Sequence, residues 1–385
     1  MLRLCLLKRK FKCFCFFVII LFSVSCVSLK TQKELSEEYF NLGNDYFDLE
    51  NYSRATDLYL KALSYNKIIK RGITMNIISL FSGAGGLDLG LIQAGNTVIW
   101  ANDIDKDAVA TYRENIGDHI VCDDIKNIDI AELPDADVVV GGFPCQGFSL
   151  ANRMRTLEDD RNQLYRFFYN TIKIKQPKFF IAENVKGILS LGKGEAIKQI
   201  VADFEDAGYI TSVTLVNMAN YGVPQTRQRV IIIGQRKDLG ETLIFRFPQH
   251  THAKNGDLPR WISIKDAIDH FPDPDTENDV VNHTYSAYKV EYRNFTGHRQ
   301  TDPDKPSPTV LARGNGKGGV CAIPHYNGKR RLSIRESASV QTFPESFHFV
   351  GTMNSCYRQI GNAVPVKFAA MLGAELMRIE KEELL

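Results

Sequence analysis

The sequence has little net charge, no paired cysteines and only one long uncharged run near its start. The 47 lysines and arginines almost balance the 45 aspartates and glutamates, which leaves a formal net charge of +2. A strongly basic chain is therefore excluded, and any surface that binds nucleic acid must be a local patch. A chain of 385 residues can bury a sizeable core and predicts roughly two or three domains.

The cysteines show no spacing typical of a metal site or a disulfide framework. Half of the eight precede residue 27, and the other half are scattered without a CxxC pair. The two groups are Cys5, Cys13, Cys15 and Cys26, and Cys122, Cys145, Cys321 and Cys356. This distribution favours a reducing compartment and argues against zinc.

Residues 1–30 differ from the rest of the chain. A basic start without acids precedes an uncharged run from Cys13 to Leu29. The pattern predicts a signal peptide, of the lipoprotein type because Cys26 follows Ser-Val-Ser. A short membrane anchor is the alternative, since the run is near the lower limit for spanning a bilayer, roughly 17 residues.

Residues 31–74 resemble a single tetratricopeptide-like helical hairpin. The matching positions are Tyr39, Leu42, Gly43, Tyr46, Ala55, Tyr59 and Ala62. One such repeat cannot bury its own apolar face, and about three are needed for stability. An amphipathic hairpin with no recognition role fits the segment equally well.

A single cysteine follows a short apolar run and a glycine pair. Residues 137–140 predict a buried strand, and Gly141-Gly142 end it. Pro144 then fixes the backbone just before Cys145. A lone cysteine is more often structural, but a thiol on a stiffened loop at a strand end is placed as a nucleophile.

A glycine-rich turn joins the first predicted strand to a helix. The strand covers 77–81, the turn 82–86 and the helix 87–93. Such a turn brings backbone N–H groups close to a ligand. The dinucleotide fingerprint is not met, because Asp88 stands where its third glycine belongs.

Acidic residues follow the next two predicted strands, 97–101 and 119–122. Asp103 comes after the first and Asp124 after the second. An acid at the tip of the second strand can accept hydrogen bonds from ribose hydroxyls. Either aspartate alone would more simply be a helix cap, but their recurrence at successive strand ends favours a ligand site.

Further polar groups follow later strands. Glu183 ends a strand predicted over 177–182, so it should share a sheet edge with the cysteine loop. A carboxyl there could protonate a bound base. Arg227 and Arg229 alternate on an extended segment and should point the same way, toward phosphate or a pyrimidine oxygen. A salt-bridged edge strand is the simpler alternative.

Taken in their order along the chain, these segments resemble the bacterial DNA cytosine-5 methyltransferases. The resemblance covers residues 75–385 almost end to end. Its motifs are Leu80–Gly90, Gly141–Ser149, Glu183–Val185, Tyr221–Arg229, Arg331–Pro344 and Tyr357–Val366. It implies an α/β fold, with a Rossmann-like S-adenosylmethionine-dependent methyltransferase domain and a smaller, mostly β target-recognition domain.

The resemblance also implies roles for single residues. The implied catalytic residues are Cys145, Glu183, Arg227 and Arg229. The implied cofactor-binding residues are Phe81, Gly83, Gly85, Leu87, Asp103, Ile104, Asp124, Ile125, Pro144, Asn362 and Ala363. The family more often has glutamate where Asp103 stands, which puts the reach of this side chain in question. No metal is implied.

The implied domains are a catalytic domain, 75–235 completed by 350–385, and a recognition domain, 236–349. Basic residues outnumber acids between 285 and 331, where glycines interrupt them, as expected of loops that follow a phosphate backbone. The last motif opens a single predicted helix running to about residue 381. The sequence of residues 236–349 does not indicate which DNA sequence is recognised.

The implied function is methyl transfer to C5 of a flipped-out cytosine in a specific duplex DNA sequence, through a covalent Cys145 adduct. The enzyme would be a monomer and the modification half of a restriction–modification system, with a separate cognate endonuclease. A tRNA cytosine-5 methyltransferase, or an envelope-associated adaptor with an inert methyltransferase domain, are the alternatives.

Export conflicts with methylation of chromosomal DNA. We therefore expect a cytoplasmic enzyme and interpret residues 1–74 as the product of a gene fusion or a misplaced start codon. Met75 would lie close to the true start of the domain.

Overall fold

The computed structural model describes residues 74–143, 163–240, 243–292, 300–312 and 323–383. The chain divides after Thr74 into two units, and all the elements named below belong to the second, Met75–Leu385. The predicted leader (1–30) and tetratricopeptide-like hairpin (31–74) lie outside the described residues, Thr74 excepted. No helix within the described ranges has the length and apolar character needed to cross a membrane.

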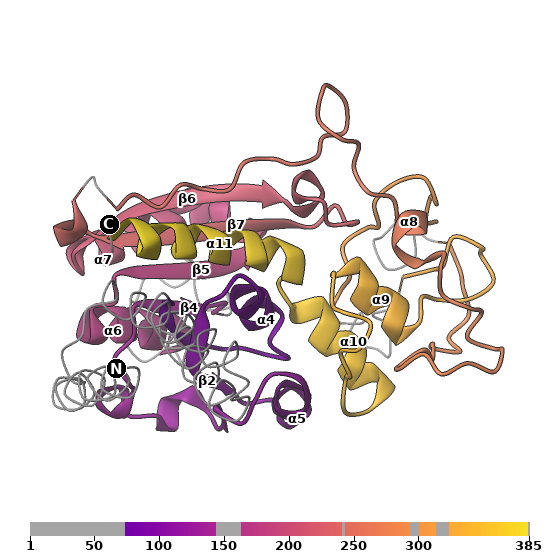
Figure 1. Cartoon of the computed structure of the whole chain (residues 1–385), viewed down its shortest axis with the longest axis horizontal. Helices are drawn as coiled ribbons and strands as arrows, with labels where there is room; N and C mark the ends of the chain where they lie inside the picture. The colour runs from indigo at the N-terminus through magenta and orange to yellow at the C-terminus, as the bar shows by residue number, and fades with distance from the viewer. Residues whose placement is uncertain (1–73, 144–162, 241–242, 293–299, 313–322, 384–385) are drawn as a thin grey trace, which may run out of the picture. The chain divides into compact units, whose positions relative to one another are not determined.

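A seven-stranded sheet forms the centre of this unit, in the order β3-β2-β1-β4-β5-β7-β6 (Figure 1). Its strands are β1 (Asn76–Leu80), β2 (Thr97–Asp103), β3 (Ile120–Cys122), β4 (Val138–Gly141), β5 (Phe179–Val185), β6 (Tyr209–Asn217) and β7 (Gln228–Arg236). Strands β1 to β5 run parallel, and β7 is antiparallel to both of its neighbours. The predicted α/β class is confirmed, with strand ends shifted by a few residues.

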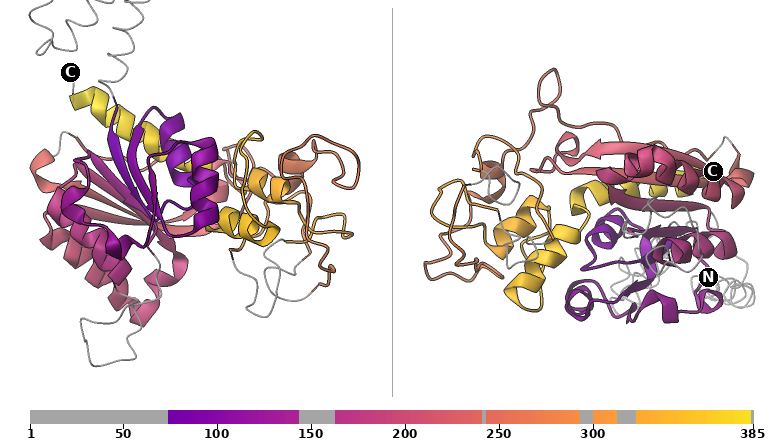
Figure 2. Two further views of the ribbon diagram at one scale, coloured as in Figure 1. Left: turned by 90° about the horizontal axis from the view of Figure 1, so that it is seen from below. Right: turned by 180° about the vertical axis from the view of Figure 1, so that it is seen from behind.

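Helices cover both faces of the sheet, as Figure 2 shows in its left view. Helices α4 (Gly86–Gln93), α5 (Lys106–Asn115) and α11 (Val366–Glu383) pack on one face, and α6 (Gln163–Lys175) and α7 (Glu195–Asp206) pack on the other. The strands supply apolar residues to both faces in alternation: Ile77 belongs to the first layer and Ile78 to the second. Short 3-10 turns lie at 125–127, 130–132, 186–189, 191–194, 218–221 and 237–239.

The C-terminal segment forms two helices. The single predicted last helix is wrong, because α10 (Met353–Asn362) ends before α11 begins at Val366. Pro365 lies between them, and a residue that precedes proline is disfavoured in a helix. Helix α11 packs on α4 so closely that a Cβ at Gly90 would lie 2.4 Å from the Ala369 Cβ. Residues from the end of the chain thereby complete the first layer.

The region after β7 contains only two short helices in its described part up to residue 349, α8 (Ile264–Ile268) and α9 (Ile334–Val340). The expectation that residues 236–349 are mostly β is wrong for the described part. Its extended segments meet in isolated bridges only, such as Tyr285 with Ser333 and Pro324 with Arg331. An apolar cluster of α8, α9 and α10 forms its own small core.

Candidate active site

A cavity of about 880 Å³ opens at the carboxyl ends of β1, β2, β4 and β5. This is the edge where an open parallel sheet binds ligands. Nine of the predicted cofactor residues lie in its wall: Phe81, Gly83, Leu87, Asp103, Ile104, Asp124, Ile125, Asn362 and Ala363. Gly85 packs behind the wall, and Pro144 lies outside the described residues.

The glycine turn between β1 and α4 has a backbone that few side chains would tolerate. Gly83 and Gly85 have φ angles of 57° and 85°, and even Phe81 has a φ of 57°. A Cβ at Gly85 would lie 2.3 Å from the Ile116 Cδ1. The turn is thus fixed in a tight conformation, and strained backbone of this kind concentrates at ligand sites.

The acid at the end of β2 holds the glycine turn. Asp103 accepts hydrogen bonds from the Gly83 N–H at 2.8 Å and from the Asp105 N–H at 2.8 Å. Burial raises the pKa of Asp103 above its ordinary value, and these two N–H groups oppose the rise. Ile104 beside it is 64 % exposed, which leaves an apolar surface at the cavity for a flat ring.

Asp124 and Ile125, the predicted site residues after β3, lie in different environments. Asp124 caps the turn at 125–127, because its side chain accepts a hydrogen bond from the Lys126 N–H at 3.1 Å. The capping alternative is therefore correct for Asp124, although the residue also lies in the cavity wall. Ile125 is buried and supplies apolar surface.

Glu183 and Arg229 face each other at the other end of the cavity. Their Oε1 and Nε atoms are 2.7 Å apart, and both side chains are largely buried. The contact is not aligned as a hydrogen bond, so both atoms lack such a partner among the described residues. A buried carboxyl with unused hydrogen-bonding capacity is suited to contact a polar ligand.

The same carboxyl adjoins the start of the cysteine loop. Because β4 and β5 are parallel neighbours, Gly142 follows β4 beside Glu183, and a Cβ at Gly142 would lie 3.3 Å from the Glu183 Oε2. The Asn184 side chain donates a hydrogen bond to the Phe143 carbonyl at 3.0 Å. Cys145 comes two residues later in the sequence and lies outside the described residues.

Arg227 joins three parts of the chain. Its guanidinium donates to the carbonyls of Val310 and Gly361, at 3.3 and 3.0 Å. Burial lowers the pKa of Arg227 to about 9; nearby Arg229 adds to the fall and Glu183 opposes it. Both arginines line the cavity. Arg229 lies in β7, inside the sheet, and Arg227 lies just before this strand, so neither belongs to an edge strand.

A family model described as C-5 cytosine-specific DNA methylase matches residues 75–378. The chain belongs to this family. The type II methyltransferase M.NgoFVII of Neisseria gonorrhoeae is 39% identical over 328 residues, which cover 79% of this chain and 86% of that protein. The type II methyltransferase M.FnuDI of Fusobacterium nucleatum is 38% identical over 328 residues, 78% of this chain and 94% of that protein.

Solved structures agree on the methylase fold. An Escherichia coli prophage protein described as a DNA modification methyltransferase has a TM-score of 0.64 at 25% identity, covering 80% of this chain and 99% of its own. The Dnmt2 methyltransferase of Schizosaccharomyces pombe has a TM-score of 0.59 at 22% identity, covering 79% and 98%. At this identity the second likeness shows the fold alone.

The cofactor end of the methylase cavity fits S-adenosylmethionine. Its volume of about 880 Å³ is ample for a ligand of that size. Gly83 is part-exposed, with open space over its backbone. Asp103 can accept from ribose hydroxyls, and Ile104 offers apolar surface to adenine. S-adenosylmethionine is the cofactor of this methylase.

The C-terminal segment closes part of the cavity wall. Asn362 ends α10, and Ala363 follows it in an extended conformation. Arg358 on the same helix donates from its Nη2 to the Asp105 Oδ2 at 2.8 Å, which ties α10 to the end of β2. Arg358 was not predicted as a site residue, although it lies inside the last matching motif.

Asp88 was not predicted as a site residue either. Its sequence position was noticeable only as a mismatch to the dinucleotide fingerprint, yet it lies in the cavity wall with Ser79 and is fully buried. The sequence did contain a signal for this residue: Asp88 is an acid in the first turn of the helix that follows the glycine turn.

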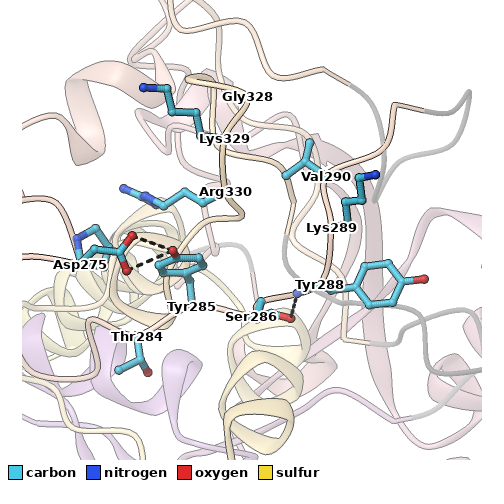
Figure 3. Close-up of a pocket in the computed structure, with 12 residues that line it drawn as sticks. Asp275, Thr284, Tyr285, Ser286, Tyr288, Lys289, Val290, Gly328, Lys329 and Arg330 are labelled. Carbon is cyan, nitrogen blue, oxygen red and sulfur yellow. Dashed lines mark hydrogen bonds between the residues drawn. The ribbon is translucent and has the colours of Figure 1, made fainter.

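A second hollow, of about 700 Å³, lies in the region after β7 (Figure 3). Buried Arg330 binds Glu336 through two contacts of 2.7 Å, and Arg331 stacks on the Tyr288 ring at 5.5 Å. Tyr288 is 49% exposed, and no described acid lies within ion-pair distance of Lys289 or Lys329. Two such ammonium groups in one hollow with an exposed ring suit a phosphate-bearing partner.

Proposed function

We propose that this DNA cytosine-5 methyltransferase acts through Cys145 and Glu183, which meet at one cytosine flipped out of duplex DNA. The observation that carries the proposal is the contact of the Glu183 carboxyl with the start of the cysteine loop at Gly142. The relatives are named type II methyltransferases, which supports a role as the modification enzyme of a restriction–modification system.

The chemistry has to overcome the poor nucleophilicity of cytosine C5. The Cys145 thiolate adds to C6, while Glu183 supplies a proton to N3, so that C5 gains enamine character. S-adenosylmethionine supplies an electrophilic methyl group when bound. C5 would take that methyl group and lose its own proton to a base. The C6–sulfur bond would then break to release the thiolate, and N3 would return its proton to the Glu183 carboxylate.

Three further residues hold these groups in place. Arg229 orients the Glu183 carboxyl, since the two side chains are 2.7 Å apart in a largely buried setting. Asn184 fixes the chain at Phe143, just before the loop. Arg227 ties the recognition region and α10 to the cavity. These arginines would also hold the base and the loop.

The recognition region, residues 236–349, would bind the duplex around the flipped base. The hollow with Tyr288, Lys289 and Lys329 supports this assignment, because its charge and exposed ring match a nucleic-acid backbone. The enzyme would act as a monomer without a metal, beside a separate cognate endonuclease.

Residues 1–74 would take no part in methyl transfer, and the enzyme would be cytoplasmic, where its DNA is found. The family match begins at Met75, after the signal-like and tetratricopeptide-like segments. Translation from Met75 tests this: an active, soluble product is expected, and an insoluble, inactive one would show that the leader is required.

The catalytic assignment is tested by Cys145→Ser. Methyl transfer from labelled S-adenosylmethionine to duplex DNA should fall below detection, while DNA binding stays measurable by gel shift. Full activity of the variant would overturn the assignment. Parallel assays with tRNA decide between the two nucleic-acid substrates, since methylation of tRNA alone would refute the DNA-directed function.

A further inference from the structure

A buried carboxyl lies beneath the cofactor end of the cavity and is connected to the surface. Asp88 is fully buried; its Oδ1 accepts from the Ser79 hydroxyl at 2.6 Å and its Oδ2 from the Tyr112 hydroxyl at 2.9 Å. The Tyr112 oxygen is also 3.0 Å from the His119 Nε2, and His119 is half-buried. These side-chain contacts, from Ser79 through Asp88 and Tyr112 to His119, thus connect the cavity wall with solvent.

No cation in the described part of the chain balances this carboxyl. The groups acting most strongly on Asp88 come from β1 (Ser79), α5 (Tyr112) and β2 (Asp103), and the only charged one among them is a second acid. No lysine, arginine or histidine of the described residues lies within ion-pair distance of it. Helix α11, which packs on α4, makes its contact at Gly90 through Val366 and Ala369.

Besides Asp88, the cavity wall holds Asp103, Asp123 and Asp124, together with the cation Lys126. The other carboxylates of the wall are paired. Arg229 faces Glu183, and Arg358 faces Asp105. Arg227 binds two backbone carbonyls. The cofactor end therefore carries negative charge that a positively charged ligand can neutralise.

We propose that Asp88 is a positioning residue that selects the positively charged cofactor over its neutral product. The proposal rests on the cofactor assignment above. S-adenosylmethionine carries a sulfonium, an ammonium and a carboxylate, so its net charge is positive. Loss of the methyl group leaves a thioether and no net charge. A buried carboxylate in the wall attracts the first ligand and not the second, which favours exchange of product for fresh cofactor.

The cost of this group to folding supports a functional role. Burial raises the pKa of Asp88 to about 6; the hydrogen bonds from Ser79 and Tyr112 oppose the rise and Asp103 adds to it. An acid whose folded pKa is raised stabilises the fold at low pH and loses that contribution as pH rises through about 6. At neutral pH the ionised Asp88 therefore lowers the stability of the fold, and such destabilising groups are common at functional sites.

The wild-type full-length enzyme gives the first test. Dissociation constants for S-adenosylmethionine and S-adenosylhomocysteine are measured by calorimetry between about pH 5.5 and 7.5. The preference for S-adenosylmethionine should grow as pH rises through the pKa of Asp88, by about tenfold for a charge acting across a partly buried site. A ratio that stays constant over this range would overturn the proposal.

Asp88→Asn gives the second test, because it keeps the shape and removes the charge. At pH 7.5 it should weaken S-adenosylmethionine binding by about tenfold and change S-adenosylhomocysteine binding by less than about twofold. Its melting temperature should be equal to or above that of the wild type. Any pH dependence that remains in the variant reports Asp103, which is unchanged.

Tyr112→Phe is the matched control. It keeps the carboxylate and removes one hydrogen bond to it, so the pH at which the cofactor preference appears should rise. Equal losses for both ligands, together with a lower melting temperature in Asp88→Asn, would show a merely structural role. Failure of the wild type to bind either ligand would instead refute the cofactor assignment, which separates the two claims.

Discussion

The sheet and the recognition region hold their backbones by different means. In the sheet, strands pair in continuous register, as β5 does with β7 from Phe179 to Val185. In the recognition region, buried guanidinium groups bind backbone carbonyls that would be paired between strands in a sheet. Arg335 is fully buried and donates to the carbonyls of Val281, Pro344 and Phe347.

Under the proposed function, this difference separates the two tasks of the enzyme. A regular sheet fixes several strand ends at one edge, which is what a reaction centre needs. A region held by a few side-chain contacts can vary its loops while keeping its core. Catalysis should therefore depend on the sheet edge, and DNA affinity on the recognition region. The variants below test the two regions separately.

Glu183→Gln should have the largest effect, on the sheet side. Losing the proton donor should lower the rate of methyl transfer by about 10²–10⁴-fold, which is typical of general acid catalysis. Cofactor and DNA dissociation constants should stay within about twofold, and single-turnover kinetics separate the chemical step from binding.

The matched control for this change is Glu195→Gln, at an exposed site at the start of α7. It should leave the rate unaltered. A Glu183→Gln enzyme that transfers methyl groups at the wild-type rate would contradict the proposed mechanism.

Arg335→Met, in the recognition region, should have the second largest effect. It leaves three buried carbonyls without their donor and should lower the free energy of unfolding by about 3 kcal/mol. Chemical denaturation measures this, with the exposed Arg260→Met as the control. Equal stability of the two variants would show that the guanidinium does not organise the region.

The sheet was more predictable than the recognition region for a physical reason. Its strands and the glycine turn depend on residues close in sequence, and their order along the chain fixes the shared edge. The contacts of Arg335 reach back to Val281, and no local pattern indicates that a guanidinium will bind carbonyls there. The expectation of a mostly β region came from the family resemblance, whereas the described extended segments of this region meet only in isolated bridges.

The same distinction applies inside the cavity. Asp103 and Glu183 lie at the carboxyl ends of β2 and β5 and could be placed by topology alone. Asp88 could not, because its role depends on Tyr112 in another helix and on the absence of a nearby cation among the described residues. Arg227 lies in the cavity wall, but its partners at Val310 and Gly361 come from distant segments that no local pattern indicates.

Lys289→Gln combined with Lys329→Gln should have the smallest effect. Each lysine lost from the hollow should lower DNA affinity a few-fold and reduce the slope of log affinity against log salt by about one. The rate at saturating DNA should not change. Lys381→Gln, at an exposed site near the end of α11, is the control and should leave both quantities unaltered.

Bisulfite sequencing of DNA from cells that express the full-length chain tests the central claim most directly. We expect C5-methylated cytosines at one recurring sequence with the wild type, and none with Cys145→Ser or Glu183→Gln produced at the same level. Unmodified DNA with the wild type, or an unchanged methylation pattern with both variants, would contradict the account.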